Sequence, residues 1–256
     1  AITSGAARKI VLSRAECRPM PPGLDLAGSA EALARRYPDA FVALVSLPGA
    51  GTWITATPET LLRVAGGEAA TMALAGTQWP DPALPLEALD WPAKIVEEQG
   101  LVALYVREAF AEAGLHNVTE TAPRTVAAGH LRHLRSDFRA PVAESDAAAL
   151  ARLLRALHPT SAVCGLPRDA AHAFLARHEG YDRRAYTGFL GPAGFEDGTH
   201  LFVNLRCAQV LGDSLCLYVG GGIVAGSEPA LEWTETEEKA RVIGDVLLGA
   251  SAPSPA

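Results

Sequence analysis

Apolar residues recur along this chain with two periods, and stretches of the two kinds alternate. Short apolar or β-branched runs predict strands over 9–13, 40–46, 52–56, 117–122, 128–135, 186–190, 200–208 and 214–219. Apolar positions at helical spacing predict helices over 28–37, 90–114, 145–156, 168–178 and 229–248. The pair Gly66-Gly67 predicts a hairpin turn between two further strands, T-P-E-T-L-L-R-V and A-T-M-A-L-A-G-T.

Strands interspersed with helices indicate an α+β layered protein with mixed antiparallel strands. The strands over 186–190, 200–208 and 214–219 are expected to form one antiparallel group. No segment has the composition of a linker, so residues 1–250 are predicted to form a single domain. The tail S-A-P-S-P-A at 251–256 is predicted to be disordered.

Composition narrows the class of protein. The chain has 256 residues, 49% hydrophobic and 20% charged, with a net charge of −7, which fits a globular protein with a sizeable core. Without a basic run, nucleic acid is not expected as a partner. No apolar stretch approaches the roughly 20 residues of a membrane span, and the N-terminus lacks a signal-peptide core. We therefore expect a cytoplasmic protein.

The four cysteines, Cys17, Cys164, Cys207 and Cys216, show no zinc-binding spacing and lie in apolar surroundings. They are predicted to be buried free thiols rather than disulfides.

Basic residues are used unevenly, with 19 Arg against three Lys, which are Lys9, Lys94 and Lys239. Arginine does not lose its proton in proteins whereas lysine can, so each lysine is of interest. Lys9 opens the apolar strand K-I-V-L, where burial would favour the neutral amine. Lys9 is thus a candidate base; the alternative is a lysine that caps a strand edge.

The segment 219–239 holds the densest group of candidate site residues. A glycine-rich turn at Gly220, Gly221 and Gly222 is predicted to follow a strand, and a helix carrying Glu232 and Glu235 comes after it. Glycines allow close approach of backbone N–H groups to an anion, and glutamates three apart share a helix face. The combination indicates a Mg²⁺-bridged carboxylate or phosphate. The alternative is a tight turn before a solvated first helical turn.

Eight segments, in order along nearly the whole chain, resemble the chorismate-utilising enzymes and, among them, the isochorismate synthase branch. They are K-I-V-L-S-R (9–14), T-P-E-T-L-L (57–62), A-L-A-G-T (73–77), K-I-V-E-E-Q (94–99), L-H-P-T-S-A-V-C-G-L-P-R (157–168), Y-D-R-R-A-Y-T-G-F-L-G (181–191), F-V-N-L-R-C-A (202–208) and Y-V-G-G-G-I-V-A-G-S-E-P-A-L-E-W-T-E-T-E-E-K (218–239).

The resemblance implies a layered α/β/β/α chorismate-binding fold and a Mg²⁺-dependent conversion of chorismate to isochorismate, in menaquinone or siderophore biosynthesis. The motif H-P-T-S-A-V-C-G favours this branch over the amine-transferring relatives and the salicylate synthases. A salicylate synthase stays open as an alternative, as does a non-catalytic paralogue. Whether the protein is a monomer or a homodimer also stays open.

The resemblance also assigns roles to residues. Lys9 is the expected base and Glu59 the expected acid, on opposite faces of the substrate ring. Glu98, Glu232 and Glu235 are the expected metal ligands. Arg206 is suited to a substrate carboxylate, because guanidinium binds carboxylate through two hydrogen bonds. The other residues expected to contact substrate are Ala75, Gly76, Thr77, Leu157, His158, Tyr186, Leu205, Tyr218, Gly220, Gly221 and Gly222.

Two departures from the family pattern stand out. Gln99 occupies a position where the family has a histidine, which is expected to lie behind the metal ligands. Family members also carry roughly a hundred or more residues before the lysine that Lys9 matches. Either the usual N-terminal portion is missing here or the natural enzyme is minimal, and both readings stay open. If strands are missing, an exposed sheet edge is expected to be open to a partner subunit.

Overall fold

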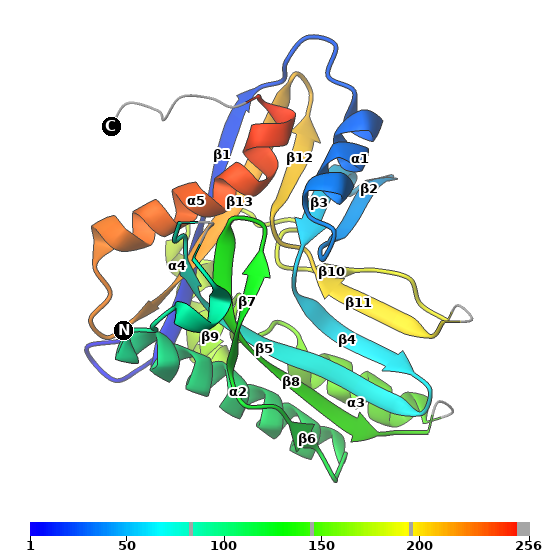
Figure 1. Ribbon diagram of the computed structural model, residues 1–256, viewed down its shortest axis with the longest axis vertical. Coiled ribbons are helices and arrows are strands. Elements are labelled where there is room, and N and C mark those ends of the chain that lie inside the picture. The colour runs from blue at the N-terminus through cyan, green and yellow to red at the C-terminus, as the bar shows by residue number, and fades with distance from the viewer. Residues whose placement is uncertain (82–83, 144–145, 195–196, 250–256) are drawn as a thin grey trace.

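A computed structural model of the protein describes residues 1–81, 84–143, 146–194 and 197–249 (Figure 1). The predicted disordered tail at 251–256 lies outside the described residues. The strands form two antiparallel sheets. The first contains, in spatial order, β2 (Phe41–Leu47), β3 (Gly51–Thr57), β12 (Cys207–Leu211), β13 (Ser214–Val224), β1 (Lys9–Pro19) and β9 (Gly165–Leu166).

The second sheet contains, in spatial order, β10 (Phe189–Leu190), β11 (Thr199–Val203), β4 (Thr60–Ala65), β5 (Glu68–Gln78), β8 (Leu131–Pro141) and β6 (Thr119–Glu120). A further strand, β7 (Arg124–Ala128), pairs with β8 as well. All pairings in both sheets are antiparallel.

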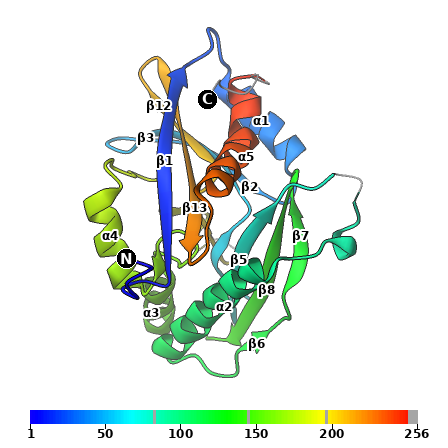
Figure 2. The same ribbon diagram turned by 90° about the vertical axis from the view of Figure 1, so that its left-hand side faces the viewer.

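Helices cover both sheets. Helices α1 (Leu26–Arg36) and α5 (Pro229–Leu247) pack on the first sheet, whereas α2 (Ala93–Ala113) and α3 (Ala147–Leu157) pack on the second (Figure 1). Helix α4 (Arg168–His178) lies against β9 and β1, and a 3₁₀ turn spans Leu86–Ala88. Figure 2 shows the long strands β1 and β13 side by side with α5 against β13. The predicted α+β, α/β/β/α architecture is confirmed.

Local sequence explains where the helices begin and end. Asp25 and Asp146 accept hydrogen bonds from backbone N–H groups in the first turns of α1 and α3, as N-cap residues do. Helix α2 begins after Pro92 and ends at Gly114, which has φ 75°. A left-handed residue is a common end of a helix and favours glycine.

Each sheet buries its own apolar core. Helices α2 and α3 cover a core that includes Val106, Phe110, Phe138 and Leu153. The core under α1 and α5 includes Leu33, Ile54, Leu215 and Ile243. No helix in the described part of the chain is both long and apolar enough to cross a membrane.

Two short crossings of the chain between the two sheets lie next to each other. From β3 to β4 the chain passes through Pro58 and Glu59, and from β11 to β12 through 204–206. The two crossings are hydrogen-bonded to each other: Ala56 N donates to Arg206 O at 3.0 Å, and Val203 N donates to Glu59 O at 3.0 Å. The fold therefore fixes the side chains of Glu59 and Arg206 where the two sheets meet.

Several sequence predictions need correction. The apolar run 200–208 is two strands, because the second crossing interrupts it. The run 128–135 spans a hairpin between β7 and β8, which turns at Gly129-His130, and the run 186–190 contributes only β10.

Two further predictions are wrong. Gly220 to Gly222 are not a turn but part of β13, which pairs with β1 through Val224. Cys17 and Cys216 face each other across β1 and β13 and form a disulfide, because the strand register makes them direct neighbours. Cys164 and Cys207 are buried free thiols, as predicted.

Candidate active site

A cavity opens between the two sheets next to their crossings. Most of the predicted site residues line it, and they come from both sheets and from two helices. They are Lys9, Glu59, Ala75, Gly76, Thr77, Glu98, Tyr186, Leu205, Arg206, Tyr218, Gly220, Gly222 and Glu235.

Lys9 begins β1 and is 1% exposed. Its Nζ lies 2.8 Å from Oε1 of Glu98, which belongs to the second turn of α2. A buried ammonium needs a charged partner, and Glu98 supplies it. A cation that took over Glu98 would leave the Lys9 amine beside the cavity without that partner.

Glu59 sits on the first crossing and is 5% exposed. Burial raises the pKa of its carboxyl to about 7, although a hydrogen bond from Thr160 and the charge of Lys9 act in the opposite direction. Thr160 Oγ1 donates to Glu59 Oε1 at 3.3 Å. A carboxyl group that is partly protonated near neutral pH can act as a general acid.

Arg206 sits on the second crossing, in the left-handed region at φ 46°. Burial lowers the pKa of its guanidinium group. One guanidinium nitrogen lies 3.4 Å from Nε2 of His133, whose Nδ1 is 2.6 Å from Gly76 O. Burial, followed by the charge of Arg206, lowers the pKa of His133 to about 3. The imidazole is therefore neutral at physiological pH and leaves the Arg206 charge available to an anion in the cavity.

Glu232 and Glu235 project from the first two turns of α5. Glu232 Oε1 lies 2.8 Å from Nζ of Lys94, which is one turn before Glu98 on α2. Glu235 pairs with Lys239 one turn further along α5, and Thr77 Oγ1 donates to it at 3.0 Å. Burial acts to raise the pKa of Glu235, but Lys239 and Thr77 outweigh it, so this pKa is lowered.

The three glycines of β13 provide space on its two faces. A Cβ on Gly222 would lie 2.7 Å from Glu98 Oε1 and 2.8 Å from Lys9 Cε. A Cβ on Gly220 would lie 3.0 Å from the Tyr186 hydroxyl. Gly221 faces Glu232 instead, at 3.5 Å, and does not line the cavity. These glycines serve close packing rather than the predicted turn.

The donor set suits a hard divalent cation. Mg²⁺ prefers oxygen ligands, and Glu98, Glu232 and Glu235 offer three carboxylates from α2 and α5. Each of these carboxylates contacts an ammonium group of a lysine, so each already has a cationic partner. Within the described ranges, no three His, Cys, Asp or Glu side chains yet converge tightly enough to hold a metal ion.

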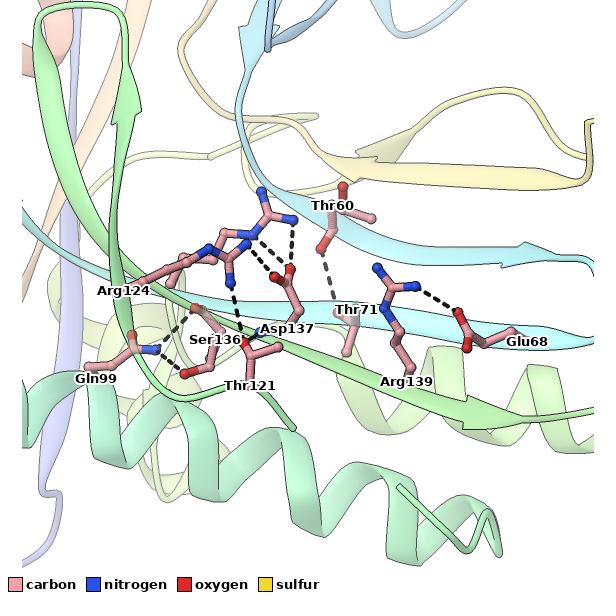
Figure 3. A network of polar contacts seen from close by, with 11 residues as sticks. Thr60, Glu68, Thr71, Gln99, Thr121, Arg124, Ser136, Asp137 and Arg139 are labelled. Atoms are coloured by element: carbon pink, nitrogen blue, oxygen red, sulfur yellow. Dashed lines mark hydrogen bonds and ion pairs between the residues drawn. The ribbon is translucent and has the colours of Figure 1, made fainter. Parts of the chain in front are cut away.

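Some predicted residues lie elsewhere. Leu157 is 1% exposed in the core under α3, and His158 Nε2 lies 3.1 Å from Thr187 O; neither lines the cavity. Gln99 points from α2 to β5 and β8, where its Nε2 donates to Ala73 O at 3.1 Å and to Ser136 Oγ at 3.4 Å (Figure 3). Gln99 therefore anchors the helix to the sheet.

Four residues of this site were not among the predicted ones: Thr160, His133, Lys94 and Lys239. The scarcity of lysine was the signal for the last two. For His133 the only signal is a polar side chain at an inward position of a strand. For Thr160 there was no separate signal beyond its place in the motif around His158.

Comparisons with known proteins agree with this geometry. Residues 1–248 match the family model described as "Chorismate binding enzyme". The salicylate biosynthesis isochorismate synthase of Pseudomonas aeruginosa is 34% identical over 252 residues, which are 96% of this chain and 52% of that protein. Anthranilate synthase component 1 of Streptomyces coelicolor is 32% identical and covers 98% of this chain and 50% of its own length.

The isochorismate synthase MenF of Escherichia coli is 30% identical over 250 residues, 96% of this chain and 57% of that protein. The solved structure of MenF, described as menaquinone-specific, superimposes with a TM-score of 0.85 at 29% identity, over 96% of this chain and 57% of that one. The chain thus spans about half the length of the curated relatives it matches.

Proposed function

Because this chain belongs to the chorismate binding enzyme family, we propose that it catalyses the conversion of chorismate to isochorismate. The observation that carries the proposal is the placement of two buried groups around one cavity: the amine of Lys9, on β1 of the first sheet, and the carboxyl of Glu59, on the crossing between the sheets. The similarity to isochorismate synthases supports it. The anthranilate synthase relative has a different name and a similar degree of identity, so the product has to be determined by experiment.

The chemistry adds water to ring carbon C2 and expels the hydroxyl at C4, with the ring double bonds shifting between them. Lys9 Nζ accepts a proton from the attacking water. Glu59 donates a proton to the departing hydroxyl, which leaves as water. Atoms balance, since one water enters and one leaves. General acid–base groups of this kind contribute about 10²–10⁴-fold each.

The substrate carries two carboxylates, one on the ring and one on the enolpyruvyl side chain. Arg206 is the proposed partner of the carboxylate on the enolpyruvyl side chain, through paired N–H donors. Tyr186, Leu205 and Tyr218 line the space for the ring. Gly76 and Thr77 bring a short backbone segment to the same wall.

Mg²⁺ is the proposed cofactor, held by Glu98, Glu232 and Glu235. When bound, it would neutralise the ring carboxylate of the substrate. The residues of this chain do the rest: they orient the substrate, exclude bulk water and move the two protons. Menaquinone and siderophore biosynthesis are the proposed settings, and a cytoplasmic location stays a prediction.

Product analysis tests the proposal. The protein is incubated with chorismate and Mg²⁺, and the products are separated by chromatography. Isochorismate as the sole product is expected. Fluorescent salicylate would identify a salicylate synthase instead, and a folded protein without turnover at any Mg²⁺ concentration would identify a non-catalytic paralogue.

A further inference from the structure

All three lysines of this protein contact glutamates proposed as metal ligands. The chain has three lysines and 19 arginines, and the three lysines pair one-to-one with the three glutamates proposed as metal ligands: Lys9 with Glu98, Lys94 with Glu232, and Lys239 with Glu235. The other ion pairs among the described residues use arginine or histidine.

The chemistry of the two cations explains the choice. Guanidinium forms a planar, bidentate pair with carboxylate, whereas ammonium is a compact point charge on a flexible stem. A lysine can therefore neutralise a carboxylate through one contact, and it can move away without breaking a bidentate pair of hydrogen bonds. This property suits a carboxylate that must later take a different cation.

Lys94 shows the arrangement most clearly. It stands on α2 and reaches α5, where its Nζ lies 2.8 Å from Glu232 Oε1. Its side chain is 34% exposed while that of Glu232 is 11% exposed, so the lysine is the more accessible partner and can move toward solvent. Lys94 also borders a second hollow, which touches the main cavity at Glu98.

Lys239 has a similar alternative. Besides Glu235, its Nζ donates to Gly220 O at 3.0 Å. The backbone carbonyl retains a hydrogen bond for the ammonium if the carboxylate turns away. Both lysines can thus be released without leaving a buried charge unpartnered.

We infer that Lys94 and Lys239 are internal counter-ions that hold the metal carboxylates in the metal-free protein and that Mg²⁺ binds by displacing them from Glu232 and Glu235. The inference rests on the proposed function for the identity of the metal. Its consequence is that these lysines lower Mg²⁺ affinity while they stabilise the protein without metal. A purely structural ion pair would stabilise both states and leave the affinity unchanged.

The test measures the thermal midpoint of the full chain against Mg²⁺ concentration, with no substrate. Metal that binds only the folded state raises the midpoint according to its affinity. Lys94→Met is expected to lower the midpoint without metal and to tighten the Mg²⁺ dissociation constant by up to about fivefold, the equivalent of a partly exposed ion pair. Lys94→Arg is expected to keep the metal-free midpoint and weaken Mg²⁺ binding.

The control is Arg107→Met, which removes a different ion pair of α2, that with Glu120, and should leave Mg²⁺ affinity unchanged. An unchanged dissociation constant in both Lys94 variants, or a change in the same direction in both, overturns the inference while the proposed activity stands. If the unaltered protein shows no response to Mg²⁺, the inference falls together with the metal, and product analysis still decides the reaction separately.

Discussion

The hydroxyl of Thr160 donates a hydrogen bond to Glu59 at 3.3 Å, and both side chains are buried. This bond stabilises the charged carboxylate and so opposes the rise in its pKa caused by burial. Thr160→Val should therefore raise the pKa of Glu59 above its present value of about 7. The alkaline limb of the kcat/KM profile against pH is expected to move to higher pH. A profile that stays in place would remove Glu59 as the group that titrates.

Glu59 also makes stability depend on pH. Its pKa in the folded protein is about 7, above the ordinary value of 4.5. The folded state therefore binds the proton more tightly than the unfolded chain, and stability falls as pH rises from the unfolded to the folded value. The loss is on the order of a few kcal/mol, because each pKa unit is worth about 1.4 kcal/mol.

Glu59→Gln cannot ionise and should escape this loss. The quantity to compare is the midpoint of the variant minus that of the unaltered protein. This difference is expected to be more positive at about pH 8 than at about pH 5. Scanning calorimetry at the two pH values provides the measurement. An equal difference at both would mean that the folded protein does not raise the pKa of this carboxyl.

Lys9→Ala tests the proposed base. Turnover of chorismate is expected to fall by about 10²–10⁴-fold, the usual contribution of a general base, while chorismate still binds through the opposite wall of the cavity. Initial rates and a binding titration separate the two effects. Because Lys9 also neutralises Glu98, the metal-free variant should melt earlier. Retained turnover would exclude Lys9 as the base.

Gly222→Ala tests the space that the glycine provides. The added methyl group would lie 2.7 Å from Glu98 Oε1, so the Lys9–Glu98 pair must shift. Overpacking of this kind costs about 1–3 kcal/mol, and activity should fall with stability. Gly221→Ala is the matched control, since its nearest neighbour would be 3.5 Å away. Equal effects of the two substitutions would contradict the assignment of faces.

Arg206→Met should weaken chorismate binding. A hydrogen bond to a charged group is worth about 1.5–3 kcal/mol, so KM is expected to rise by about 10- to 150-fold. Arg206→Lys keeps the charge without the paired donors and should recover part of the loss. Steady-state kinetics at saturating Mg²⁺ distinguish these outcomes, and an unaltered KM in Arg206→Met would place the substrate carboxylate elsewhere.

The sequence predicted elements best where local chemistry decides the structure. Pro92 and Gly114 delimit α2 because one cannot donate and the other tolerates a left-handed end. The division of 200–208 into two strands could not be predicted, because apolar residues lie on both sides of Arg206. Only the crossing between the sheets interrupts the strand there.

Tertiary packing decides the other cases. Gly220 to Gly222 read as a turn, yet they are glycine because Tyr186, Glu232 and the Lys9–Glu98 pair approach β13 closely. The pairing of Cys17 with Cys216 follows from a register between strands 199 residues apart, which no local pattern encodes. The motif resemblance located most of the cavity residues, but not His133, whose role depends on its contact with Arg206.

The most direct test of the central claim is to run the reaction with chorismate and Mg²⁺ in water enriched in oxygen-18 and to weigh the isochorismate by mass spectrometry. Addition of water at C2, with Lys9 as base and Glu59 as acid, predicts one heavy oxygen per product molecule, and loss of this product in Lys9→Ala and Glu59→Gln. Isochorismate without the label, or labelled product at full rate from both variants, would contradict the account.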